Sequence, residues 1–273
     1  MVSIATITSM CFTLMICFAS PLVLLWWFRR RYQASMTSFF VGMISFVIST
    51  QILEAMFHYY FLTVNQTTAS WLTQPLLYAL YGGIMAGLFE ETGRFISFKW
   101  LLKKQNRVQD SLSYGVGHGG IEAMLIVGTT YLNNLAISFL INQGLIETLG
   151  LDTEIQETIV TQLTQISPFI FSLAGYERLM TIVIQIGLSV LVFKAIRERK
   201  IRYYGVAILL HALLDFPAAL AQTGVFNIFV VEGIVTLFAI GFLIFIVKQL
   251  KAYAYDLTKS EDDELEKYKR VGY

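Results

Sequence analysis

The sequence is poor in charged residues and in cysteine. Only 14% of its 273 residues are charged, whereas about 25% is usual for a soluble domain. Its two cysteines, Cys11 and Cys17, lie close together in one apolar run, which indicates neither a disulfide framework nor a cysteine-based metal site. The net charge of +1 gives no basis for nucleic-acid binding. These scarcities exclude an ordinary soluble domain and a disulfide-rich secreted scaffold.

Long apolar runs, by contrast, recur along the whole chain. Hydrophobic residues make up 56% of it, and a membrane-spanning helix needs about 20 in succession. Backbone groups in lipid must be satisfied within the segment, which in runs this long requires helices. We therefore predict an all-α polytopic membrane helix bundle, with a single transmembrane domain at 1–250 and a charged cytoplasmic tail at 251–273. Its seven predicted transmembrane helices lie at 4–28, 36–62, 75–102, 112–138, 168–194, 203–222 and 226–247.

Lysine and arginine predict the orientation of these helices. Of the 20 basic residues, all but Arg94 and Arg178 follow the first, third, fifth or seventh run. The other connections (63–74, 139–167 and 223–225) contain none. The positive-inside rule then places the N-terminus outside and the C-terminus in the cytoplasm. The outer connection carries acidic residues between apolar ones over 142–167, and we expect a short amphipathic helix there.

Polar residues within the runs gather at one depth. A charge inside the bilayer costs about 2.5 to 3.5 kcal/mol even on the mildest scale, so such residues call for a use. With about 1.5 Å of rise per residue, three runs place ionisable groups at one level of the cytoplasmic half. We therefore predict a polar pocket that opens towards the cytoplasm. Its members are Glu90, Glu91 and Arg94, His118 and Glu122, and His211 and Asp215.

Spacing within each run predicts local pairs. Glu90 and Arg94, His118 and Glu122, and His211 and Asp215 are each four residues apart and share a helix face. Glycines around His118, in YGVGHGG, allow a neighbouring helix to approach closely. Outside this group, we favour an interhelical clasp for Glu54 with His58 and a structural ion pair for Glu177 with Arg178.

This group suits hydrolysis by either of two routes. Glu91, His118 and His211 are candidate ligands of a divalent metal such as zinc, with a second glutamate as general base on the bound water. Without a metal, a glutamate would activate water and the histidines would donate to the oxyanion. Which of Glu90 and Glu91 points inward stays open, because adjacent helical residues are about 100° apart.

Four short segments, in order along the chain, carry a resemblance to a known family. They are EETGR at 90–94, GVGHGGIEA at 115–123, YERLM at 176–180 and HALLD at 211–215. Together they resemble the superfamily of CAAX prenyl endopeptidases and bacterial CPBP intramembrane proteases. More closely, they resemble its YhfC-type branch of intramembrane metalloproteases. The resemblance covers the motif-bearing core at about residues 80–220.

The resemblance implies an intramembrane protease of a bacterial cell membrane, acting on a membrane-anchored or lipid-modified peptide. It implies that Glu90 or Glu91 is catalytic and that His118 and His211 contact a metal or water. The supporting residues are Arg94, Glu122, Glu177, Arg178, Gln185 and Asp215. Gln185 departs from the family pattern, which has a histidine there. Glutamine is a poor zinc ligand but a good hydrogen-bond donor.

Two other functions fit the same residues. A proton-coupled transporter would use the carboxylates and histidines as a relay, and inverted repeats would be expected with it; the sequence shows none. The departure at Gln185 also leaves open a non-catalytic membrane scaffold, or an immunity-type partner, on the same fold.

Overall fold

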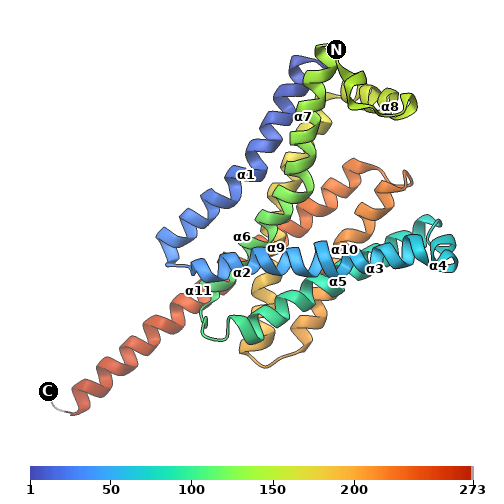
Figure 1. Cartoon of the computed structure of the whole chain (residues 1–273). Coiled ribbons are helices and arrows are strands. Elements are labelled where there is room, and N and C mark those ends of the chain that lie inside the picture. The colour runs from blue at the N-terminus through green and yellow to red at the C-terminus, as the bar shows by residue number, and fades with distance from the viewer. Residues whose placement is uncertain (272–273) are drawn as a thin grey trace.

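The computed structural model describes the backbone of residues 1–271 and the side chains of residues 1–253, and it contains no strand in that backbone. The expected all-α fold is confirmed (Figure 1). The prediction of a charged tail at 251–273 concerns side chains that lie mostly outside those described.

The elements are α1 (Ile4–Tyr32), α2 (Met36–Phe46), η1 (Val47–Glu54), α3 (Ala55–Tyr59), η2 (Tyr60–Val64), α4 (Gln66–Trp71), α5 (Pro75–Ile96), η3 (Ser97–Leu101), α6 (Val108–Glu122), η4 (Ala123–Gly128), α7 (Thr129–Asn142), η5 (Ile146–Leu149), α8 (Thr153–Gln165), α9 (Pro168–Arg197), α10 (Arg202–Gln222) and α11 (Ile228–Val271).

Within the described residues, six helices are long and apolar enough to cross a membrane. They are Ile4–Tyr32, Met36–Val64, Val108–Asn142, Pro168–Arg197, Arg202–Gln222 and Ile228–Tyr253. The remaining expected run forms α5 and η3, which are helical over 75–101. This run is not among the six, because Glu90, Glu91 and Arg94 lower its apolar character.

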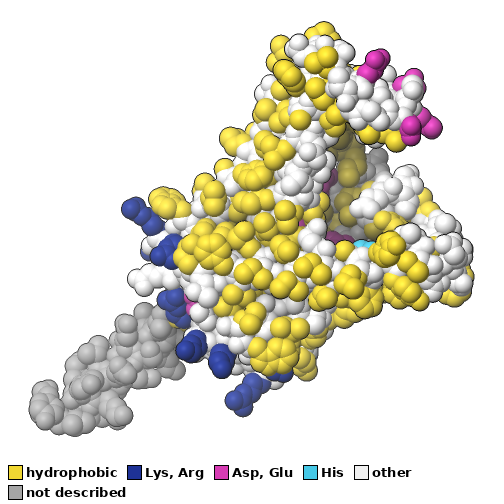
Figure 2. All heavy atoms as spheres, viewed as in Figure 1, with side chains coloured by type: hydrophobic (Ala, Val, Ile, Leu, Met, Phe, Trp, Pro, Cys, Tyr) yellow, Lys and Arg dark blue, Asp and Glu magenta, His cyan; other side chains and the backbone are white. Residues whose placement is uncertain are grey.

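The two ends of the bundle differ in charge. Figure 2 shows the basic side chains gathered at the end opposite α8. The short helix expected within 142–167 is present as α8, which carries acidic residues outwards and buries Leu163 against the apolar cluster around Phe171. The one-sided distribution of lysine and arginine in the sequence is therefore one-sided in space as well.

Several spans are continued by π-helical turns. Element η1 continues α2 and ends at Glu54, and η4 continues α6 directly after Glu122. Such wide turns are rare and occur often at functional sites. Both lie beside residues that line the polar cavity described below.

Glycines on α6 hold the bundle together at its centre. This helix is buried on nearly every face and packs against α1, α2 and α9. A Cβ atom on Gly115 would lie 2.5 Å from Cα of Ile186 in α9, and one on Gly117 would lie 2.0 Å from the backbone oxygen of Phe39 in α2. The close approach expected around His118 is therefore confirmed, and it brings α9 within reach of that residue.

We expect Gly115→Ala to lower the Tm of the protein in detergent. The new methyl group would overlap the backbone of α9, and overpacking of this kind typically costs about 1–3 kcal/mol. Gly205→Ala on α10 is the matched control, because its Cβ would meet nothing within 4 Å. Equal melting temperatures for the two variants would contradict the tight packing of α6 on α9.

Candidate functional site

Four helices bring polar side chains together around Glu90. Its Oε2 lies 2.8 Å from Nε2 of His118 and 3.1 Å from Nε2 of Gln185, and Nε2 of His211 is 3.8 Å away. Because an ionised carboxylate only accepts hydrogen bonds, His118 and Gln185 donate to it. Among the described residues, no hydrogen-bond partner is found for Oε1 of Glu90, which lies at the wall of a cavity. One carboxylate oxygen is thus held and the other is free to meet water.

Glu91 has a different environment from its neighbour. Its carboxylate accepts from Nη1 of Arg94, at 2.6 and 2.8 Å, and from Nδ1 of His211 at 2.7 Å. Glu91 and Arg94 are completely buried. Arg94 therefore pairs with Glu91 rather than with Glu90, the residue four positions earlier. Glu91 fixes the ring of His211, whose Nε2 remains directed towards Glu90.

Gln185 lies at the centre of the hydrogen-bond network. Its Oε1 accepts from Nη2 of Arg94, and its Nε2 donates to Oε2 of Glu90 and, at 2.8 Å, to Oε2 of Glu122. A guanidinium only donates and a carboxylate only accepts, so these neighbours fix the orientation of the amide. The sequence marks Gln185 only as a departure from a pattern. Gln185 lies seven residues after Arg178, on the same face of the helix. This spacing could have predicted that Gln185 belongs to the site.

An ion-pair cluster borders the network on the far side of Gln185. Oε1 of Glu122 accepts from Nη1 of Arg178 at 2.9 Å, and Arg178 also binds Glu177, which confirms the expected Glu177–Arg178 pair. The pairing expected for Glu122 with His118 is not formed. Asp215 keeps the expected proximity to His211, with 3.5 Å between Oδ2 and Nε2.

Aromatic packing holds His118 in place. The ring meets Phe46 edge-on at 5.2 Å between centroids and lies nearly parallel to Tyr114 at 6.0 Å. His118 is completely buried, and its Nδ1 has no hydrogen-bond partner. The ring is therefore oriented by this packing and by its hydrogen bond to Glu90, and no described group orients it through Nδ1.

As arranged here, these residues do not fit a three-ligand metal centre. Among the expected ligands, Glu91 is engaged by Arg94 and by Nδ1 of His211, the nitrogen on the side away from Glu90. His118 lacks the orienting partner that a metal-bound histidine usually has at its second nitrogen. Within residues 1–253, no three His, Cys, Asp or Glu side chains form a group that could hold a metal ion.

A polar cavity of about 400 Å³ leads away from Glu90. Glu122, Gln185 and His211 line its inner part, and the lining continues along α5 past Tyr81 to Tyr78, the end of the helix away from the basic residues. Figure 2 shows the corresponding hollow, with acidic side chains inside it.

This direction differs from the expected opening towards the cytoplasmic, lysine- and arginine-rich end. The cavity does not extend towards that end because buried aromatic side chains pack together on that side of the site. Phe98 and Tyr114 follow Arg94 and precede His118 on their helices, are fully buried, and pack with ring centroids 4.7 Å apart. Their buried rings lie beside the site, on the side of it nearer the basic end of α5 and α6.

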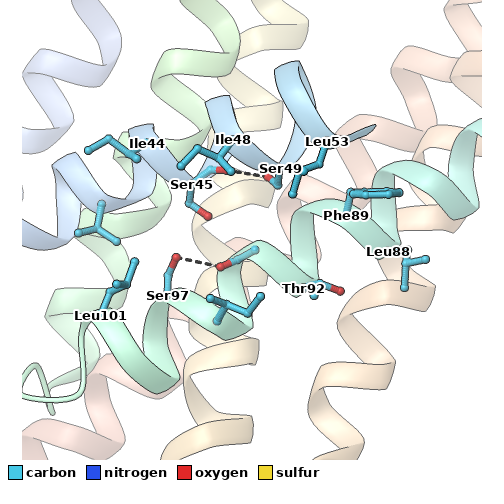
Figure 3. Close-up of a pocket in the computed structure, with 13 residues that line it drawn as sticks. Ile44, Ser45, Ile48, Ser49, Leu53, Leu88, Phe89, Thr92, Ser97 and Leu101 are labelled. Carbon is cyan, nitrogen blue, oxygen red and sulfur yellow. Dashed lines mark hydrogen bonds between the residues drawn. The ribbon is translucent and has the colours of Figure 1, made fainter. Parts of the chain in front are cut away.

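A second hollow, of about 500 Å³, lies between η1 and α5 and is lined by apolar side chains such as Ile48 and Leu88 (Figure 3). The hydroxyl groups of Ser49 and Ser97 donate to their own helices, at 2.7 and 2.8 Å. Because it contains no ionisable group, this groove has the character of a lipid-facing surface and offers no acid–base chemistry.

Sequence comparison decides the family. The family described as YhfC intramembrane metalloprotease matches residues 15–235. The chain belongs to this family. It is 38% identical over 242 residues to the uncharacterized membrane protein YhfC of Bacillus subtilis (strain 168), which covers 87% of this chain and 94% of the relative. No solved structure matches it.

Family membership and the six apolar helices together identify an integral membrane protein. The description of the YhfC family suggests protease activity and implies a metal, typically zinc. In this chain, the Nε2 atoms of His118, Gln185 and His211 surround Oε2 of Glu90. Two of these nitrogens belong to imidazoles that could bind a metal, and the third belongs to an amide, which is a poor ligand.

Proposed function

We propose that the protein is an intramembrane protease that hydrolyses a peptide bond of a membrane-associated substrate with water activated by Glu90. The observation that carries the proposal is the arrangement of this carboxylate. Oε2 is held by His118 and Gln185, while Oε1 faces a polar cavity. A positioned carboxylate with one free oxygen suits a general base, which typically contributes about 10²- to 10⁴-fold to a rate.

In the proposed reaction, Glu90 transfers the proton and His211 stabilises the oxyanion. Glu90 takes a proton from water while the water oxygen attacks the carbonyl carbon, and it later returns that proton to the amine leaving group. In this step His211 is an imidazolium, with Nδ1–H donating to Glu91 and Nε2–H, 3.8 Å from Glu90, donating to the oxyanion that develops on the carbonyl oxygen. Glu91 and Arg94 position His211, and the Glu122–Arg178 pair positions Gln185.

The proposal includes a topology. We place α5 in the membrane as a seventh span, because its charged residues Glu90, Glu91 and Arg94 are buried among other helices and not turned to lipid. The basic end would be cytoplasmic and the N-terminus outside. Residues 1–250 would form one transmembrane domain in a bacterial cell membrane, followed by a cytoplasmic tail at 251–273.

The substrate class we propose is a membrane-anchored or lipid-modified peptide. The test is incubation of the purified protein in lipid nanodiscs with a set of transmembrane and lipidated peptides, followed by mass spectrometry of the products. Cleavage by the wild-type protein and not by Glu90→Gln is the expected result. No cleavage of any peptide would favour the non-catalytic scaffold or immunity-type partner.

The hydrogen-bond network argues against the transporter alternative. Between Glu177 and Glu90 it passes through Arg178 and Gln185. An arginine does not release its proton in a protein, so the chain of contacts is not a continuous proton relay.

Metal removal separates the two hydrolytic routes. Because the predicted ligand Glu91 is engaged by Arg94, and Nδ1 of His118 has no orienting partner among the described residues, we expect cleavage to persist after treatment with EDTA and 1,10-phenanthroline. We also expect the purified protein to carry far less than one equivalent of zinc by elemental analysis. Loss of activity on chelation, restored by zinc but not in His118→Ala, would overturn the metal-free route.

A further inference from the structure

The outer wall of the polar cavity contains an acid that the proposed reaction does not use. Glu54, at the end of η1, is only 4% exposed, and it lines the cavity. Its Oε1 lies 3.2 Å from Nε2 of His58, while its Oε2 is buried without any hydrogen-bond partner. A buried carboxylate oxygen in this state is costly unless something pairs with it.

The neighbours of Glu54 hold its side chain in place but leave one of its carboxylate oxygens without a hydrogen bond. Nδ1 of His58 lies 2.8 Å from the hydroxyl oxygen of Tyr81 on α5, which confirms the expected interhelical clasp. This clasp occupies the second nitrogen of His58 and the Tyr81 hydroxyl. Glu54 therefore lines the cavity with a carboxylate whose Oε2 has no hydrogen-bond partner among the described residues.

The cavity as a whole has an excess of negative charge. Among the residues whose side chains are described, Arg178 is the one arginine or lysine that lines it, and it is bound to Glu122 and Glu177. Asp215 on α10 also lines the cavity, and its side chain is 35% exposed. Five carboxyl groups line the cavity in all: Glu54, Glu90, Glu122, Glu177 and Asp215.

We propose that the outer part of the cavity, between Glu54 and Asp215, is a subsite for a cationic side chain of the substrate, an ammonium or guanidinium group. The inference rests on the proposed function and adds a substrate class to it: a membrane peptide with a lysine or arginine beside the scissile bond. A cation there would give the Glu54 carboxylate, which has no cationic lysine or arginine partner among the described residues, a charge-assisted interaction. It would enter from the end of the bundle away from the lysine and arginine residues of the protein.

Binding measured without turnover tests the subsite. Two polyleucine transmembrane peptides, identical except for one lysine or one norleucine near the outer end, are titrated against Glu90→Gln protein in nanodiscs by fluorescence anisotropy. The lysine peptide should bind about tenfold tighter or more, the worth of a hydrogen bond between charged groups. Adding Glu54→Gln should remove most of this preference, whereas Glu147→Gln, a charge change on the exposed outer connection, should leave it unchanged.

Three outcomes decide between the claims. Equal binding of the two peptides, or a lysine preference that survives Glu54→Gln, would overturn the subsite. Tyr81→Phe keeps every charge while removing the clasp, so retained preference in this variant would show that charge and not general distortion is measured. A Glu54-dependent preference in a protein that cleaves no peptide would refute the protease and leave the cation subsite standing.

Discussion

Glu90→Gln is expected to lower the rate of peptide cleavage by at least about 100-fold, the typical contribution of a general base, while the Tm stays unchanged. Glutamine has the same shape, and its Oε1 can still accept from His118 and Gln185, the two donors to Glu90. Only the ability to take a proton from water is lost. The measurement is the initial rate of cleavage in nanodiscs, together with a melting curve of the same preparation.

Glu91→Gln is the matched control for this substitution. Glu91 is buried against Arg94 and does not line the cavity, so its loss should weaken the fold and leave the folded fraction with a measurable rate. The reverse pattern, full activity in Glu90→Gln and none in folded Glu91→Gln, would move the role of general base to Glu91.

Arg94→Met should cause the largest loss of stability of any variant considered. Arg94 is completely buried, and it supplies two hydrogen bonds to Glu91 and one to Gln185. Removing one partner of a buried ion pair leaves the other charge without compensation, which typically costs about 3 to 5 kcal/mol. Reversible unfolding in mixed micelles gives the free energy of unfolding directly.

The double variant Glu91→Gln with Arg94→Met isolates the effect of the orphaned charge. With both charges gone, and with a glutamine oxygen still able to accept from His211, the double variant should be more stable than Arg94→Met alone. If the two losses of stability simply added, Arg94 would act through packing and not by compensating Glu91.

The helices and the depth of the site follow from the sequence because both depend on features that repeat. The runs expected at 168–194 and 203–222 are α9 and α10 to within a few residues, since apolar length alone defines them. The level shared by Glu90, His118 and His211 follows from a fixed rise per residue. In the structure Glu90 lies 2.8 Å from Nε2 of His118 and 3.8 Å from Nε2 of His211, so these three side chains do lie close together.

The pairing within the site could not be predicted in the same way. Spacing put Glu90 with Arg94 and His118 with Glu122, but the partners that form are Glu91 with Arg94 and Glu90 with His118. The partner of a side chain often lies on another helix. Which partner it meets depends on how each helix is rotated about its axis, and the spacing of residues does not determine that rotation.

The direction of the cavity depended on packing between distant segments. Phe98 and Tyr114 are ordinary apolar residues in the sequence, and their packing against each other beside the site appears only in the structure. The free oxygen of Glu54 likewise depends on where Tyr81 holds His58. Neither contact has a signature at the level of residue spacing.

The pairing of Arg94 with Glu91 has a consequence for biogenesis. In the topology proposed above, helix α5 leaves the ribosome well before α9 and α10 and enters the membrane before Gln185 and His211 exist to contact it. Its arginine and one of its two glutamates are three residues apart on one helix, and they can neutralise each other as soon as that turn forms. The insertion machinery then receives a segment with one uncompensated carboxylate instead of three separate charges. A contact that positions His211 in the finished protein thus also eases the delivery of α5 into the bilayer.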